Sequence, residues 1–76
     1  MKTSTKGRKL RAKLVERDIS IPLLAKELGM NSSTFYRKLQ RGTGAFTVGE
    51  MQGIVRRAEL TDEETLDIFL RDNQTW

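Results

Sequence analysis

The groups that can do chemistry in this 76-residue chain are hydrogen-bonding and charged side chains, because it contains no cysteine and no histidine. The lack of cysteine excludes disulfides and thiolate metal sites. The lack of histidine removes the commonest metal ligand and general base. No serine, threonine or lysine has a base placed beside it by the sequence. We therefore expect no enzyme, no cofactor and no small-molecule substrate.

The densest set of groups suited to binding lies in residues 32–41, with the sequence SSTFYRKLQR. As a helix with Phe35 and Leu39 turned inward, this stretch has a polar opposite side. That outward side consists of Ser33, Tyr36, Arg37, Gln40 and Arg41. An arginine on such a surface can donate two hydrogen bonds to the O6 and N7 atoms of guanine.

Two other motifs resemble ligand sites and have simpler explanations. The acidic residues Asp62, Glu63, Glu64 and Asp67 lack the alternating ligands and turn glycine of a calcium loop. Negative charge is favourable in the first turn of a helix by itself. Residues 42–44 lack the following Gly-Lys-Ser/Thr of a phosphate-binding loop. We expect neither a metal site nor a nucleotide site.

The net charge of +4 hides an asymmetry. Residues 1–58 hold 13 Lys and Arg against 4 acids, whereas residues 59–76 hold 1 against 6. This difference either orients a polyanion or only keeps the chain soluble. The first helix also has two interpretations. Its basic residues either help to bind a polyanion or only form a solvated face: Arg8, Lys9, Arg11, Lys13 and Arg17. A membrane-surface role is disfavoured, because the apolar face is narrow and lacks aromatic residues.

Cap signals divide the chain into five helices that make one domain, with an ordered core at about residues 5–71. A polar cap residue flanked by an apolar pair precedes three of them. The caps are Ser20, Asn31 and Thr47, and Thr61 adds a capping box with Glu64. The expected helices are residues 5–17, 21–28, 32–41, 48–58 and 62–71. We expect an all-α five-helix bundle.

Apolar residues recur at helical spacing in each segment, which predicts the core. The inward set is Leu10, Leu14, Leu24, Ala25, Leu28, Phe35, Leu39, Val48, Met51, Ile54, Val55, Ala58, Leu66, Phe69 and Leu70. Gly49 and Gly53 fall on the solvent side of their helix. Ile68 also falls outward and, with Trp76, predicts a surface for a homodimer.

No apolar run approaches the roughly 18 residues needed to span a bilayer. The basic N-terminus is not followed by the apolar stretch of a secretory signal. We expect a cytoplasmic protein with no membrane partner.

The most informative stretch is residues 20–42, SIPLLAKELGMNSSTFYRKLQRG. It predicts two short helices that meet at Gly29, a residue that adopts the left-handed backbone of a tight turn. Ala25 is small where the helices would cross. Such a pair projects its second helix from the surface, where that helix can enter the major groove of DNA.

At these residues the chain resembles the lambda-repressor-like (Cro-type, xenobiotic-response-element) helix-turn-helix regulators. The resemblance covers about residues 8–70. Its central matches are Leu24-Ala25, Leu28-Gly29, Asn31 and Ser33-Thr34-Phe35. Further along, Lys38-Leu39, GAFT at 44–47, Glu50-Met51 and Asp62–Glu64 are similar to small phage regulators of Gram-positive bacteria.

The resemblance implies a lambda-repressor-like fold and a sequence-specific double-stranded DNA-binding transcription regulator, a phage or prophage repressor or Cro-like protein in a bacterial or phage-infected cell. It implies base contacts by Ser32, Ser33 and Arg37, and the helical wheel adds Tyr36. Contacts to the DNA backbone are expected from Lys38, Gln40, Arg41, Thr43 and Thr47.

Two departures leave a second function open. Many family members begin the second helix with a glutamine that binds a phosphate, whereas this chain has Ile21-Pro22. One residue is also added before Gly42 relative to the commoner spacing. The alternative is a protein-interaction module of the same fold that modulates a repressor partner.

Overall fold

The computed structural model describes residues 4–70, and all regular secondary structure in that range is helical. The α-helices are α1 (Thr5–Glu16), α2 (Ile21–Glu27), α3 (Ser32–Arg41), α4 (Val48–Ala58) and α5 (Asp62–Thr65). A 3₁₀ turn, η1 (Thr43–Ala45), joins α3 to α4, and a π-helical turn, η2 (Leu66–Leu70), continues α5. All five predicted helices are confirmed, and each begins at the expected residue.

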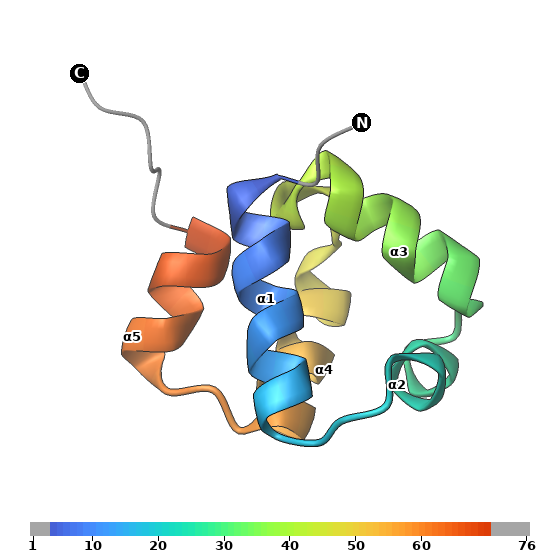
Figure 1. The fold of residues 1–76 in the computed structure, drawn as a ribbon, viewed down its shortest axis with the longest axis horizontal. Helices are drawn as coiled ribbons and strands as arrows, with labels where there is room; N and C mark the ends of the chain where they lie inside the picture. Colours follow the sequence, from blue (N-terminus) through green and yellow to red (C-terminus); the bar gives the residue numbers. More distant parts are fainter. Residues whose placement is uncertain (1–3, 71–76) are drawn as a thin grey trace.

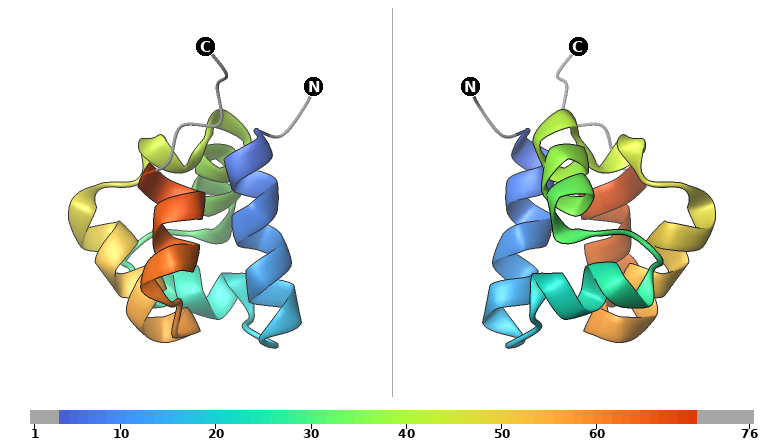
Figure 2. Two further views of the ribbon diagram at one scale, coloured as in Figure 1. Left: turned by 90° about the vertical axis from the view of Figure 1, so that its left-hand side faces the viewer. Right: turned by 90° about the vertical axis from the view of Figure 1, so that its right-hand side faces the viewer.

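The helices surround one core. In Figure 1, α1 runs through the centre of the view, with α5 beside it, α4 behind it and α3 at the edge of the molecule. The side views in Figure 2 also place α1 and α5 side by side. None of the helices in residues 4–70 is long and apolar enough to cross a membrane.

The predicted caps explain where the helices begin. The Asn31 side chain accepts from the Thr34 N–H at 2.9 Å, and Thr47 forms a capping box with Glu50. Thr61 forms the equivalent box on α5. One cap was not predicted. It is Ser4, whose Oγ accepts from the Gly7 N–H at 2.9 Å at the start of α1. Each cap satisfies a helix-terminal N–H that would otherwise lack a partner.

The buried core contains most of the apolar residues that the helical spacing predicted. The predicted residues that are buried are Leu10, Leu14, Leu24, Ala25, Phe35, Leu39, Ile54, Ala58 and Phe69. Phe46 completes this core. Its ring centroid lies 5.1 Å from that of Phe35 and 6.5 Å from that of Phe69, within the range of favourable aromatic pairs.

Three predicted orientations are wrong. Val48 is 66% exposed, because it is the first residue of α4 and lies beyond the core. Leu66 is 43% exposed, whereas Ile68 is 1% exposed. The cause is η2, since a π turn changes the residue spacing that an α-helix would have and turns Ile68 inward beside Phe69. Ile68 therefore cannot form the expected homodimer surface, and Trp76 lies outside the described residues.

The backbones of α1 and α3 approach each other closely at Gly7. Gly7 is buried, and a Cβ atom at this position would overlap the carbonyl oxygen of Leu39. Beside this crossing, the Ser4 N–H donates to the Gln40 carbonyl oxygen at 3.3 Å. The start of α1 is therefore attached directly to the last turn of α3.

The prediction that Gly53 lies on the solvent side of its helix is wrong. A Cβ atom there would lie 2.6 Å from a methyl group of Leu28, so α4 approaches the end of α2 closely at this point. Gly49 fits the prediction, because no atom lies within 4 Å of its Cβ position.

Gly7, where a side chain would clash, and Gly49, where it would meet no atom, give a stability test. We expect Gly7→Ala to lower the free energy of unfolding by about 1–3 kcal/mol, because the new methyl group forces α1 away from α3. The control Gly49→Ala should raise it by up to about 1 kcal/mol, because alanine favours the helix and meets nothing. Urea denaturation followed by circular dichroism measures both. Equal effects of the two changes would contradict the close crossing.

Candidate nucleic-acid interface

The two sides of α3 differ in the way that the sequence predicts. Phe35 is 0% exposed and Leu39 is 2% exposed, so one side of the helix is fully packed. The other side is exposed and carries Ser33, Tyr36, Arg37, Gln40 and Arg41. This set, the outward face of α3, offers hydroxyl, phenol, amide and guanidinium groups to another molecule.

The turn before α3 sets the direction in which this face points. Gly29 has φ +81°, the left-handed conformation that the sequence predicts. The Gly29 N–H donates to the Lys26 carbonyl and the Met30 N–H donates to the Ala25 carbonyl, both at 3.0 Å. This pair of hydrogen bonds is a Schellman motif, which ends α2 abruptly.

The two helices point in different directions after this turn. Figure 1 views α2 nearly along its axis while α3 runs across the picture, and the side view from the right in Figure 2 shows the reverse. The packing of Leu24 and Ala25, both buried, keeps α2 against the core. As a result α3 lies at the edge of the molecule with its outward face uncovered.

The first turn of α3 contains a chain of hydrogen bonds that the sequence did not reveal. Asn31 Oδ1 accepts from the Thr34 N–H at 2.9 Å and from the Ser33 hydroxyl at 2.8 Å. One turn later, the Arg37 guanidinium donates to Thr34 Oγ1 at 3.2 Å. Thr34 was matched only as part of the motif, although its position three residues before Arg37 allows this contact.

The last turn of α3 is tied to the start of α4. Lys38 Nζ lies 2.8 Å from Glu50 Oε1 and 5.8 Å from the ring centroid of Phe46. The hydrogen bond from Lys38, followed by that from the Thr47 N–H, lowers the pKa of the Glu50 carboxyl. Lys38 is therefore engaged by a carboxylate, and the Thr47 N–H is also occupied, at 3.0 Å from Glu50 Oε1.

Thr43 does not fit the role of a DNA backbone contact. Its side chain is 2% exposed, and its hydroxyl donates to the Ile68 carbonyl oxygen. This hydrogen bond attaches η1 to η2 inside the molecule. The sequence placed Thr43 in a glycine-flanked loop, and nothing in that pattern indicates that the hydroxyl points inward.

The remaining predicted positions differ in exposure. Ser32 is partly buried at the start of α3, and Thr47 is exposed at the start of α4. Ile21, the first residue of α2, is buried in the core. The first residue of α2 therefore offers no side chain to a phosphate.

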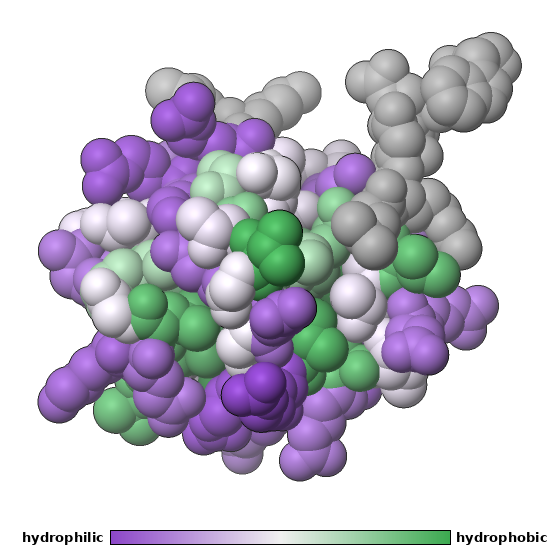
Figure 3. Space-filling view, turned by 180° about the vertical axis from the view of Figure 1, so that it is seen from behind, coloured by the Kyte–Doolittle hydropathy of each residue, from purple (hydrophilic) through white to green (hydrophobic). Residues whose placement is uncertain are grey.

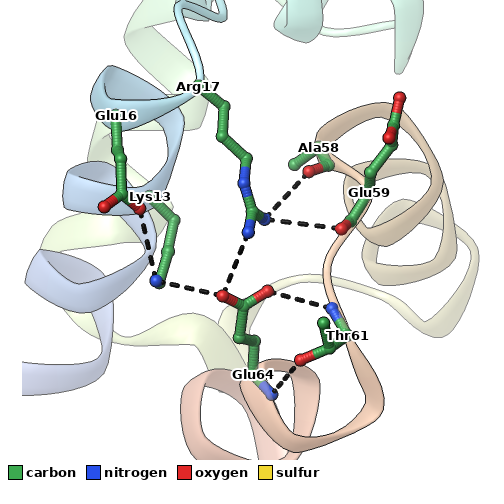
Figure 4. A network of polar contacts seen from close by, with 7 residues as sticks. All are labelled: Lys13, Glu16, Arg17, Ala58, Glu59, Thr61 and Glu64. Atoms are coloured by element: carbon green, nitrogen blue, oxygen red, sulfur yellow. Dashed lines mark hydrogen bonds and ion pairs between the residues drawn. The ribbon is translucent and has the colours of Figure 1, made fainter.

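The basic face of α1 is largely paired with the acidic α5. Glu64 Oε2 lies 3.0 Å from both Lys13 Nζ and Arg17 Nη2, and Arg17 also donates to the Ala58 carbonyl oxygen at 3.0 Å (Figure 4). Lys9 Nζ lies 3.0 Å from Asp67 Oδ1. Lys9 and Lys13 of α1, with Arg17 at its C-cap, thus hold the fold together.

The other basic residues of α1 are Lys6, which is partly buried, and Arg8 and Arg11, which are exposed; none of them forms an ion pair within residues 4–70. The basic and acidic halves of the sequence therefore do not form a separate positive end and negative end in the folded molecule. The acids of α5 neutralise one side of α1, and unpaired cations remain on the other side and on α3.

The face of the molecule that contains α4 differs from the outward face of α3, because it exposes apolar side chains. Seen from behind, hydrophobic side chains gather between hydrophilic ones (Figure 3). On α4 and η2 the exposed apolar residues are Val48 and Leu66. In the described part of the chain, no cluster of three or more acidic side chains could hold a metal ion.

A scan of protein-family models, a search of curated proteins and a search of solved structures each find no match to this chain.

The Glu64 network gives a pH-dependent prediction. Hydrogen bonds from the Thr61 N–H, Lys13 and Arg17 lower the Glu64 pKa from 4.5 to about 2. A carboxyl whose pKa is lower in the folded state stabilises the fold above its unfolded pKa and loses this effect as pH falls towards its folded pKa. Glu64→Gln should therefore lower the melting temperature at pH 7, and the difference from the native chain should shrink between about pH 4.5 and pH 2.

Glu63→Gln is the matched control, because Glu63 is exposed on the same turn of α5. Its melting temperature should stay close to that of the native chain throughout this range. Thermal unfolding by circular dichroism at each pH measures the three curves. A Glu64→Gln difference that is the same at pH 7 and pH 2 would show that the charge of Glu64 contributes nothing.

Proposed function

We propose that this chain is a sequence-specific double-stranded DNA-binding transcription regulator in which α2 and α3 form a helix-turn-helix of the lambda-repressor-like type. The observation that supports this most strongly is the outward face of α3, which is exposed and polar while Phe35 and Leu39 are buried. A helix of 10 residues held at the edge of a small bundle fits the major groove. In this proposal the protein acts in the cytoplasm as a phage or prophage repressor or Cro-like protein.

The proposed base contacts are Ser32, Ser33, Tyr36 and Arg37. Arg37 makes the most discriminating contact, because its guanidinium can bond O6 and N7 of one guanine. The short serines let the backbone of α3 approach the base pairs closely. Tyr36, at 39% exposure, can pack on a thymine methyl group or reach a phosphate.

Contacts to the DNA backbone are proposed for the end of α3 and the start of α4. Gln40 and Arg41 are exposed there, and Thr47 is exposed at the N-cap of α4. Lys38 contributes to this region while paired with Glu50, so the net charge that it adds is small. Arg41 is therefore the principal cation of this group.

One observation favours the alternative, a protein-interaction module that binds a repressor partner. Ile21 is buried, so α2 lacks the polar first residue that would bind a phosphate. DNA binding would then depend on α3, on Thr47 and on the cations that form no ion pair within residues 4–70. The exposed Val48 and Leu66 could equally contact a protein partner or a second copy of the chain.

Selection from a random duplex pool, followed by salt titration, separates the two functions. We expect one consensus to be enriched, and a plot of log K against log salt with a slope of about −1.8 or steeper, because two or more phosphate contacts release counterions. Fluorescence anisotropy with the selected duplex measures this slope. Failure to enrich any duplex, at low salt as well as high, would leave the interaction module as the better account.

Replacing Arg37 tests the face of α3 directly. We expect Arg37→Ala to reduce discrimination at one base pair by about 1–3 kcal/mol, because the bidentate pair with guanine is lost. The control Arg56→Ala removes the same charge from an exposed residue in the last turn of α4. It should leave base discrimination unchanged. Equal losses with both variants would mean that Arg37 acts only through its charge.

A further inference from the structure

The outward face of α3 contains an internal hydrogen-bond chain that determines which hydrogen-bonding groups it presents. The chain runs from Asn31 through Ser33 and Thr34 to Arg37. Only Ser33 and Arg37 belong to the expected base contacts. The other two residues act on them, and their effect on sequence preference follows from the chemistry of each bond.

The Asn31 side chain decides how Ser33 is used. Asn31 Oδ1 accepts the Thr34 N–H, so this atom is the carbonyl oxygen of the amide and can only accept. The hydrogen between it and Ser33 Oγ therefore belongs to the serine. A hydroxyl has one hydrogen, so Ser33 Oγ is left with lone pairs that face solvent. It presents an acceptor.

Thr34 decides how Arg37 is placed. Its hydroxyl oxygen accepts from one terminal nitrogen of the guanidinium at 3.2 Å, across less than one helical turn. A guanidinium has five N–H donors in a planar fork, so enough donors remain for a bidentate pair with guanine. The bond to Thr34 restricts a side chain that would otherwise sample many rotamers.

We infer that Thr34 is a positioning residue for Arg37 and that Asn31 converts Ser33 into an acceptor for the amino group of cytosine or adenine. This inference rests on the proposed function. Ser33 and Arg37 are four residues apart on one face, which is roughly 6 Å along the helix axis. Base pairs are about 3.4 Å apart along DNA. Every base pair presents one amino group in the major groove, so the acceptor selects the strand that carries it. The recognised sequence therefore has a guanine and, within about two base pairs, a cytosine or adenine on the strand that Ser33 faces.

Thr34→Val tests the positioning role. Valine keeps the shape and the backbone N–H that the Asn31 cap uses, so the melting temperature should stay unchanged. We expect the preference for guanine over the other bases at the Arg37 position to fall about 3- to 10-fold, the effect of losing one hydrogen bond. Thr34→Ser, which retains the hydroxyl, should restore it. The control Thr65→Val removes a hydroxyl from α5 and should leave the preference unchanged.

Ser33→Ala tests the acceptor role on the same duplexes. It should remove the preference for cytosine or adenine at the neighbouring position and leave the guanine preference intact. Both measurements use anisotropy with the selected consensus and with single base-pair changes.

The outcomes separate this inference from the function on which it rests. Loss of guanine preference in Thr34→Val with recovery in Thr34→Ser supports it. A native chain that enriches one consensus while Thr34→Val keeps the full preference overturns it and leaves DNA binding standing. A Ser33→Ala chain that keeps the full native preference at the neighbouring base pair overturns the acceptor role. A native chain that enriches no duplex overturns both the inference and the proposed function.

Discussion

The burial of Phe35 and Leu39 determines which side of α3 is available to another molecule. Phe35 packs against Phe46, which packs in turn against Phe69, so α3 is joined to η2 through aromatic contacts. Burying a phenylalanine side chain contributes about 1.5–3 kcal/mol. Any rotation of α3 would lose that contribution. The polar side is therefore held outward by the core and needs no partner to hold it there.

Close backbone contact reinforces this arrangement. The absence of a side chain at Gly7 lets α1 approach the Leu39 carbonyl, and Ser4 joins the two backbones beside it. The α1–α5 ion pairs then hold the opposite side of α1. A chain this short buries only a modest fraction of its surface, so such polar and close-packed contacts matter more than in a larger domain.

Electrostatics follow from the same contacts. The sequence separates basic and acidic residues along the chain, but the fold brings Lys9, Lys13 and Arg17 against carboxylates of α5 and η2. These pairs reduce the long-range field that the composition suggests. Attraction of a polyanion then depends on the cations that form no ion pair within residues 4–70, among them Arg37 and Arg41 on the outward face of α3.

Most of the fold could be predicted from the sequence because its signals are local. Cap residues and helical spacing act over three to seven residues, and they identified every α-helix and the buried side of α3. The errors arise where distant contacts decide. The π turn that buries Ile68 and the inward hydroxyl of Thr43 belong to one contact between η1 and η2. The role of Thr34 also escaped, since a threonine within a helix has no fixed hydrogen-bond partner.

The central claim, that the outward face of α3 contacts DNA, is tested most directly by NMR titration of the ¹⁵N-labelled chain with a selected duplex. We expect the amide signals of Ser33, Arg37 and Arg41 and the guanidinium signals of the two arginines to shift or broaden first, with the signals of the buried residues of α1 unchanged. Perturbations confined to α4 and η2, with the α3 signals unmoved at saturation, would contradict the account.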